Sequence, residues 1–588
     1  MGRYFPDHLE SQRGRFFKAS RSAKHEAMRP QIHRIPRLRP PSRPLTQLPR
    51  SRPQLPFLSQ PRAQQQQHTR FLTTERARWL RREIWKAGRF TAVLWSSGAL
   101  LFLVALGVQQ EWLERRFPSP HEWSLVSRKD FRSAVWEEAR ADDDADAAVA
   151  DWMHIALAYR EVLRRLEDPK IDGAGLGEQE DGGMLVAGVG RTGFDVSGKP
   201  ESWRRGYHKV LMGCGRAAEH LDGWVKDGRN NVVFPPAMVR GPSNPNPQPI
   251  PPGSPPAPRE EDCELAFEAP ETFYVRILTT RGFTDKQRLD AALAQATWLE
   301  FKGTPGAALE MYKWAVDIAA ASSPRRESLF DAGGAISASA GPVSSNVLTA
   351  TTALAVHHAR NSSPSTALSI FLSILRARRA LPAAAAAAAP PTHGTDDDDD
   401  DDSFGAARFV RSVLTPPKYP PPPSDGTAPP PRDAKAHCEE AAVMAYIGEI
   451  LYALAPPGPG GRQQDGLAWT RDAVDVAEEE LRRLVGPARS SPPANDPAVA
   501  TCRQCLQTAL DNWATMVDRL AREDRDARRR RDATAARAGI SRWLRSPAAA
   551  DDAGRWDAEA QVVRERAARA AALLLPRPAV DEPGALFA

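Results

Sequence analysis

Cys502 and Cys505 form a Cys-x-x-Cys pair, the spacing of half a zinc site or of a redox couple. Tetrahedral zinc would need two more ligands at short spacing, and Cys214, Cys263 and Cys438 are each solitary. A redox pair of the strand–helix kind would need a preceding strand, and none is predicted. We therefore predict two small residues one helical turn apart on a packing face. Five cysteines in a chain of this length do not indicate a disulfide framework.

Gly188, Gly190 and Gly193 spell Gly-x-Gly-x-x-Gly, the pattern that receives a dinucleotide pyrophosphate at a helix N-terminus. In a dinucleotide site these glycines open a helix. Here they run into Phe194, and Pro200 follows soon after. No second strand with a ribose-binding acid appears, so the pattern predicts a flexible loop rather than a cofactor site.

The remaining reactive residue types are isolated in the sequence. The adjacent His357 and His358 have no carboxylate or cysteine nearby, which predicts a packing or surface role. The acidic run Asp396–Asp402 could hold Ca²⁺ loosely, but it lacks the Gly and Glu spacing of a calcium loop. It is predicted to be a solvated linker. No nucleophile–base–acid set stands out, so we predict no enzyme, no cofactor and no metal site.

One stretch of the chain, "FTAVLWSSGALLFLVALGV" from Phe90 to Val108, carries no charge. Its length in a helix, at about 1.5 Å per residue, matches the hydrocarbon core of a bilayer. It lacks the polar stripe of a buried soluble helix, and Trp85, Trp95 and Trp112 lie near its ends. These features predict a single membrane span, with a soluble core helix as the alternative. One span cannot line a transport pathway unless the chain oligomerises, so we expect an anchor.

Charge is distributed very unevenly about this span. Residues 1–89 hold 21 Lys and Arg but 5 Asp and Glu, a net charge of +16. The whole chain carries +6, so residues 90–588 carry −10. The positive-inside rule then places the N-terminal arm inside and the C-terminal bulk outside. An acidic body also argues against nucleic-acid binding as its task.

Residues 1–72 are rich in Arg, Ser and Pro and poor in acids, a composition typical of a mitochondrial presequence. Residues 73–89 then form a basic arm on the matrix side of the inner membrane, and residues 109–588 face the intermembrane space. The alternative is a disordered basic tail that binds anionic lipid or RNA.

Beyond the span, apolar periodicity is almost entirely helical, which predicts an all-α fold. The first helical unit, residues 109–169, places Trp152, Ala156 and Tyr159 on one face. Residues 170–200 are predicted to be a flexible loop.

Residues 201–381 contain a repeat-like pattern of small and aromatic residues. Ala296, Gly303 and Ala308 are followed by Tyr312 and Ala315. The spacing resembles the tetratricopeptide repeat, in which small residues let two antiparallel helices approach closely. Further copies place matching residues at Leu354, Ala355, Ala367, Phe371, Ile447, Gly448 and Leu451. The prediction is an α-solenoid of such hairpins; an irregular helical bundle is the alternative.

Long insertions that cannot bury a core separate these helices. A Pro-rich spacer lies near residues 240–262, and residues 382–436 form a low-complexity Ala, Asp and Pro linker. Residues 437–545 are predicted to form further repeat-like helices. Residues 546–588 form a C-terminal helix and tail.

The runs "FLTTERARWLRREIWKAGRF", "QQEWLERRFPSPHEW", "WRRGYHKVLMGCGRAAEHLDGWV" and "GPSNPNPQPIPPGSPPAPREEDCE" resemble a family of filamentous-fungal mitochondrial proteins often mislabelled as sugar permeases. That family is similar, more distantly, to the tetratricopeptide adaptor subunit of the inner-membrane i-AAA protease. The resemblance covers roughly residues 70–520, while the insertion at 382–436 departs from it. It implies an anchored repeat domain whose partners are unfolded clients and the protease subunits. The alternatives are a scaffold or assembly factor for a respiratory complex, and an enzyme with a site in residues 170–280.

Overall fold

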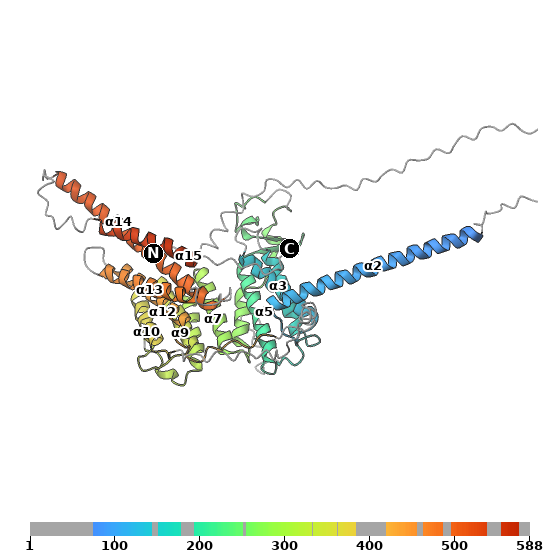
Figure 1. Ribbon diagram of the computed structural model, residues 1–588, viewed down its shortest axis with the longest axis horizontal. Helices are drawn as coiled ribbons and strands as arrows, with labels where there is room; N and C mark the ends of the chain where they lie inside the picture. The colour runs from blue at the N-terminus through green and yellow to red at the C-terminus, as the bar shows by residue number, and fades with distance from the viewer. Residues whose placement is uncertain are drawn as a thin grey trace, which may run out of the picture. The chain divides into compact units, whose positions relative to one another are not determined.

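The computed structural model describes residues 74–143, 151–177, 193–250, 255–331, 333–361, 363–383, 419–455, 462–485, 496–537 and 554–574. Within these stretches the chain is mainly helical, with 13 α-helices and one small sheet (Figure 1). This confirms the predicted helical class. By its contacts the chain divides into two units, Met1–Trp112 with Ala141–Ala148, and Leu113–Arg140 with Val149–Ala588. The predicted presequence lies outside the described residues.

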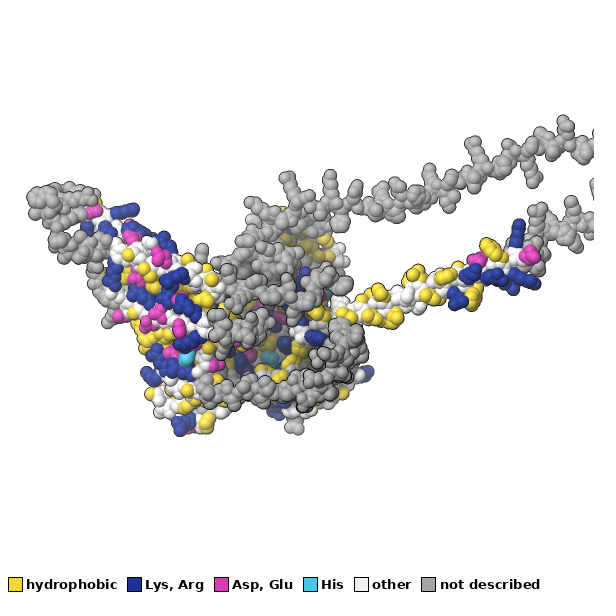
Figure 2. Space-filling view, viewed as in Figure 1, with side chains coloured by type: hydrophobic (Ala, Val, Ile, Leu, Met, Phe, Trp, Pro, Cys, Tyr) yellow, Lys and Arg dark blue, Asp and Glu magenta, His cyan; other side chains and the backbone are white. Residues whose placement is uncertain are grey.

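Helix α2 runs from Thr74 to Arg116 and is 43 residues long. The predicted span from Phe90 to Val108 lies wholly within it, with exposed side chains. Within the described chain, α2 is the one helix long and apolar enough to cross a membrane. The predicted basic arm is helical from Thr74 onward and continuous with the span. Figure 2 shows Lys and Arg side chains gathered at the N-terminal end of α2 and apolar side chains beyond them.

The second unit opens with three helices, α3 (Leu125–Asp143), α4 (Trp152–Glu167) and α5 (Glu201–His220). Helix α4 begins where the Asp151 side chain accepts a hydrogen bond from the His154 backbone N–H, which satisfies one free donor of the first turn. Of the predicted apolar face, Ala156 and Tyr159 are buried. Trp152 is partly exposed and stacks on the His220 ring, with ring centroids 3.7 Å apart.

Of residues 170–200, which are predicted to be a flexible loop, the structure describes 170–177 and 193–200, and part of this backbone is paired. Gly177 and Asp195 pair as an antiparallel bridge, and Asp195 also pairs with Arg281. Val196 is fully buried, and the Lys199 ammonium donates to the Ala174 carbonyl at 2.7 Å. These residues show no helical or strand periodicity. They are held in place because their backbone pairs with residues distant in the sequence, such as Arg281.

The predicted Pro-rich spacer lies between the second and third strands of a small sheet with strand order β2-β1-β3, in which both pairings are antiparallel. Its strands are β1 (Val225–Asp227), β2 (Val233–Phe234) and β3 (Cys263–Leu265), with 3₁₀ turns η1 (Pro236–Met238) and η2 (Glu260–Asp262). Arg240 and Arg259 pair as a parallel bridge across the spacer. The two ends of the spacer are thus held together by backbone hydrogen bonds.

The hairpins that follow are α6 (Pro270–Thr279), α7 (Asp285–Phe301), α8 (Pro305–Ala321), η3 (Arg326–Ser328), α9 (Ser345–Arg360) and α10 (Pro364–Arg379). Helix α7 starts at a capping box in which Thr284 and Gln287 satisfy each other's backbone N–H. Pro305 and Pro364 stand in the first turns of α8 and α10, where the missing N–H costs nothing. Gly303, with φ of +74°, turns the chain between α7 and α8.

The last four helices are α12 (Ala434–Leu454), α13 (Arg462–Val485), α14 (Pro497–Arg537) and α15 (Arg555–Leu574). From α4 to α10 and from α12 to α15, each described helix packs on the next in the chain, and α10 packs on α12. Contacts also skip one helix, joining α5 to α7, α7 to α9, and α12 to α14. The second helices α13 and α15 also contact each other.

Residues 419–433, the C-terminal part of the predicted linker, are packed against the helices, and we refer to them as the 419–433 strap. The Arg205 guanidinium of α5 donates to the Pro420 and Pro421 carbonyls at 2.6 and 2.8 Å. It also lies over the Tyr419 ring at 4.4 Å. The strap is thereby fixed to α5.

The strap then crosses the starts of α7 and α9. The Lys286 N–H donates to the Asp425 carboxylate at 3.2 Å, which caps α7. Asn346, which is 1% exposed, donates from its side chain to the Asp425 carbonyl at 2.8 Å. Arg432 N–H donates to the Pro382 carbonyl at 2.9 Å. The Pro-rich strap is thus bound to the helices, because helix residues such as Arg205 and Asn346 donate hydrogen bonds to its backbone carbonyls.

Candidate functional site

Most residues predicted to pack the repeats are buried. The buried ones are Ala296, Ala308, Tyr312, Ala315, Leu354, Ala355, Ala367, Phe371 and Ile447. Gly448 is also buried, and Leu451 is partly exposed. A Cβ on Gly448 would lie 2.7 Å from the Gly466 carbonyl oxygen, so this position admits no side chain without a shift of α13. The small residues therefore stand where helices approach most closely.

A polar set links the first helices of four hairpins, and we call it the Arg360 cluster. It consists of Glu300 on α7, His357 and Arg360 on α9, Tyr446 and Glu449 on α12, and Asn512 on α14. Sequence reasoning singled out His357 alone from this set. The others are ordinary residue types on helices, and only the fold brings them together.

The α7–α9 side of the cluster is an ionic network around Glu300. His357 Nδ1 lies 2.5 Å from one Glu300 carboxylate oxygen, and Arg360 Nη1 lies 3.4 Å from the other. His357 is buried and the Glu300 side chain is 8% exposed, whereas the Arg360 side chain is 42% exposed. The partner that His357 lacks in the sequence is thus supplied by a different helix. Arg360 also interacts electrostatically with Tyr446 and Glu449 of α12.

The α12–α14 side presents an exposed aromatic ring beside a carboxylate. Tyr446 is 36% exposed and stacks on the buried Phe371 ring of α10, with ring centroids 5.1 Å apart. Glu449 is exposed. Burial among the neighbouring helices nevertheless raises the pKa of the Glu449 carboxyl, while Arg360 and a hydrogen bond from Asn512 oppose the shift. The pKa of Tyr446 is raised by desolvation in the same way.

Tyr446 and Glu449 are exposed on the surface of α12, and the neighbouring helices partly desolvate both side chains. Together with Arg360 they offer an aromatic face, a carboxylate and a guanidinium from neighbouring first helices. These groups suit hydrogen bonding and stacking with another polypeptide, because each can bind backbone amides or side chains without chemical change.

The region of the alternative enzyme prediction, residues 170–280, contains buried ionisable groups that pair with one another. Tyr207 Oη donates to Glu167 at 2.8 Å, and Tyr274 Oη donates to Glu219 at 2.6 Å. Arg276 also pairs with Glu167. Burial raises the pKa of Glu219 to about 7 and raises that of Tyr207 as well. The pairs join neighbouring helices, so packing already accounts for them.

Cys502 and Cys505 lie one helical turn apart on α14, and Cys502 is buried, in keeping with the predicted packing position, but the sequence did not predict a disulfide. Cys502 is joined by a disulfide to Cys438, which the sequence left solitary, and their Cα atoms are 5.1 Å apart. Cys505 is a free thiol whose pKa burial raises to about 11. The two bonded residues are 64 positions apart, and only the packing of α12 against α14 brings them together. Sequence spacing carries no signal for such a pair.

The glycine pattern and the acidic run belong only in part to the described chain. Gly188, Gly190 and Asp396–Asp402 lie outside it. Gly193 donates its N–H to Thr279 Oγ1 at 2.9 Å, and a Cβ there would lie 2.4 Å from the Arg276 carbonyl oxygen. Glycine at this position lets the backbone of residue 193 lie directly against α6. Among the described residues, no group of three or more His, Cys, Asp or Glu could hold a metal ion.

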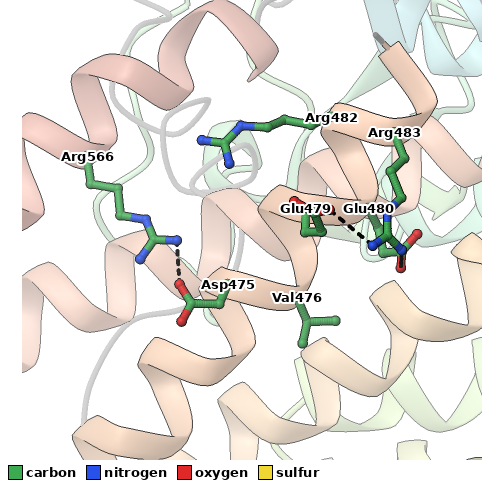
Figure 3. Close-up of a pocket in the computed structure, with 7 residues that line it drawn as sticks. All are labelled: Asp475, Val476, Glu479, Glu480, Arg482, Arg483 and Arg566. Carbon is green, nitrogen blue, oxygen red and sulfur yellow. Dashed lines mark hydrogen bonds and ion pairs between the residues drawn. The ribbon is translucent and has the colours of Figure 1, made fainter. Parts of the chain in front are cut away.

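An open pocket of about 460 Å³ lies between α13 and α15 and is lined by charged side chains (Figure 3). Arg566 reaches Asp475, and Arg483 lies 3.0 Å from both Glu479 and Glu480. Its third guanidinium, that of Arg482, pairs with Glu478. Each arginine already has a carboxylate, so the pocket is a surface ion-pair network rather than an anion site.

Comparison with known proteins adds no assignment to this geometry. No protein-family model, no curated protein and no solved structure matches the chain.

Proposed function

We propose that this protein is a membrane-anchored helical-repeat protein that binds unfolded polypeptides at the Arg360 cluster. The observation that carries the proposal is the pair Tyr446 and Glu449, which are exposed one helical turn apart on α12 and both interact electrostatically with Arg360 of α9. Stacked helical hairpins of the tetratricopeptide kind use the side formed by their first helices as an extended binding surface. The cluster draws its members from four such helices.

The membrane anchor holds the binding surface close to one membrane. Helix α2 supplies a span that confines the body beside other proteins of the same membrane and raises their effective concentration. Following the family resemblance, we propose the mitochondrial inner membrane, with the N-terminus in the matrix. The partners are unfolded client proteins and an inner-membrane AAA protease, to which the clients are presented. The Cys438–Cys502 disulfide favours a body outside the reducing cytosol, in agreement with this orientation.

Site-specific photo-cross-linking tests where a client binds. The full-length chain carries p-benzoylphenylalanine in place of Tyr446 and is reconstituted in vesicles with reduced, carboxymethylated lactalbumin, which stays unfolded. The matched control replaces Trp314, which lies on the second helix α8 and is 41% exposed. We expect strong cross-linking at position 446 and little at position 314. Equal cross-linking at both positions would contradict binding at the Arg360 cluster.

Client turnover tests the adaptor role. In cells that lack the native protein, Glu449→Lys should slow degradation of a misfolded inner-membrane reporter, because it reverses a charge in the binding face. Glu310→Lys, at an exposed site on α8, is the matched control and should leave turnover unchanged. If the purified chain degrades or modifies the reporter with no protease present, the protein is an enzyme and the adaptor proposal fails.

A further inference from the structure

Helix α2 is much longer than a membrane span requires. Its 43 residues extend roughly 64 Å at about 1.5 Å per residue. A hydrocarbon core of about 30 Å takes up about 20 of them. The segment from Thr74 to Arg89, about four turns, therefore continues as a helix out of the apolar layer on the N-terminal side. Its first residues outside that layer lie at the depth of the lipid headgroups.

The cations of this segment fall mainly on one side of the helix. At about 100° per residue, five of the six lie within an arc of about 140°. We call this set the basic face: Arg78, Arg81, Arg82, Lys86 and Arg89. Leu80 and Ile84 project on the opposite side. The segment is thus amphipathic with a one-sided positive charge, and all of these side chains are exposed.

The basic face has few partners within the protein. Arg78, Arg81 and Arg82 make no ion pair or hydrogen bond with the described residues. Lys86 pairs with Glu83 at 3.1 Å, an exposed contact one helical turn away. Arg89 lies 4.6 Å over the ring of Trp85. Guanidinium groups that lie beside an apolar span without carboxylate partners remain available to an external anion.

The other end of α2 differs in this respect. Glu111 and Glu114 accompany Arg115 and Arg116 there. Glu114 is buried and binds Arg128 at 3.2 Å. Both signs of charge occur at this end, and part of that charge is paired within the second unit. The N-terminal end of the helix is mainly basic, so the two ends present different charge to the two membrane surfaces.

We propose that the basic face binds the phosphate groups of anionic phospholipids in the leaflet on the N-terminal side of the span. The inference rests on the membrane anchor of the proposed function and deepens it by naming a lipid class. Arg89 directly precedes the apolar stretch, and Trp85 stands among the cations with 61% exposure, as an interfacial ring would. Basic residues next to a span concentrate anionic lipid by this mechanism.

The test uses the full-length chain in nanodiscs of equimolar phosphatidylcholine and phosphatidylglycerol, with spin-labelled forms of each lipid as probes. The measured quantity is the preference for phosphatidylglycerol over phosphatidylcholine at the protein boundary. The test variant is Arg78→Gln with Arg82→Gln, and the matched control is Arg115→Gln with Arg116→Gln. We expect the test variant to lower the preference at least about fivefold and the control to keep it. High salt should weaken the wild-type preference.

A wild-type chain without any preference, or an equal loss in both variants, would overturn the proposal. Resistance of the chain to carbonate extraction separates this failure from failure of the anchor. If the chain resists extraction but shows no lipid preference, the lipid proposal alone is wrong. If carbonate releases the chain from membranes, both the anchor and the lipid site are wrong.

Discussion

Helices α4–α6 and helices α12–α14 are both packed hairpins, but they are held together by different means. In α5, glycine leaves notches for aromatic rings: a Cβ on Gly213 would lie 2.6 Å from the Tyr159 ring, and one on Gly215 would lie 2.9 Å from the Tyr274 ring. In α12, Gly448 faces Gly466 of α13, so two helix backbones meet directly. In α5, glycine therefore makes room for a tyrosine ring of a neighbouring helix. In α12, it allows the backbones of two helices to cross closely.

The polar contacts of the two regions differ accordingly. Around α5, buried tyrosine hydroxyls bind carboxylates on neighbouring helices, as in the Tyr274–Glu219 pair. Between α12 and α14, a covalent Cys438–Cys502 bond joins the helices. The first arrangement responds to protons and the second to thiol reductants. The same kind of helical hairpin can therefore be sensitive to different solution conditions along one chain.

Removing the disulfide should have the largest effect. Cys438→Ala with Cys502→Ala frees a loop with a sequence separation of 64, which lowers the local free energy of unfolding by roughly 4 kcal/mol on chain-entropy grounds. Hydrogen exchange should quicken in α12 and α14 and stay unchanged in α5. Cys505→Ala is the control, and a similar effect from it would show that packing rather than the cross-link is responsible.

Replacing glycine by alanine should destabilise the protein more at a helix crossing than beside an aromatic ring. Gly448→Ala should destabilise the α12–α13 crossing by about 1–3 kcal/mol, because the added carbon would lie 2.7 Å from the Gly466 carbonyl oxygen of α13 as well as 2.4 Å from Thr470 Oγ1. Gly213→Ala should cost less, since its obstacle is a side chain rather than a helix backbone and alanine favours the helix by about 1 kcal/mol. Hydrogen exchange of the backbone amides in each helix measures the change in the free energy of local unfolding for both variants.

A second substitution checks the assignment to the ring. Tyr159→Leu removes the obstacle, so the combined Gly213→Ala and Tyr159→Leu protein should be more stable than the sum of the single changes predicts. No substitution in a single side chain should rescue Gly448→Ala in this way. Strict additivity at Gly213 would show that the ring does not define the notch.

The proton sensitivity of the α5 region can be measured at Glu219. Burial raises its pKa from 4.5 to about 7, so between these values the folded chain holds a proton that the unfolded chain releases. The free energy of unfolding therefore falls as pH rises through this window. Glu219→Gln removes that dependence and should raise stability by about 1–2 kcal/mol at pH 8, with little change at pH 4.5.

The variant and the wild type should be compared across pH, because other titrating groups then cancel in the difference. Glu310→Gln, at an exposed site, is the control and should give a difference that does not vary with pH. A difference between wild type and Glu219→Gln that is also flat with pH would contradict the raised pKa.

The 419–433 strap should contribute least. Asp425→Ala removes the carboxylate that caps α7 through the Lys286 N–H, at a cost of about 1 kcal/mol. Hydrogen exchange should quicken in the strap and at the first turn of α7 alone. Thr427→Ala, at an exposed strap position, should change neither. Loss of protection throughout α12–α14 would mean that the strap supports both regions.

Helical periodicity predicted the mainly helical class, and the repeat positions Ala308 and Phe371 are buried because any helical hairpin requires such local packing. The strap was missed because its partners, Arg205 and Asn346, are helix residues far from it in the sequence. The Arg360 cluster was missed for the same reason. Its polar residues have no fixed spacing, and only tertiary contacts between the first helices give them a common environment.

The glycines of α5 have a consequence for the order of folding. Each glycine makes a helix less favourable by about 1 kcal/mol relative to alanine, and Gly206, Gly213 and Gly215 lie in a helix of 20 residues. Such a segment gains little helix on its own, since isolated helices of this length are marginal even in favourable sequences. The rings of Tyr159 and Tyr274 must be in place before α5 becomes stable. We therefore expect α5 to form together with its neighbours rather than on its own.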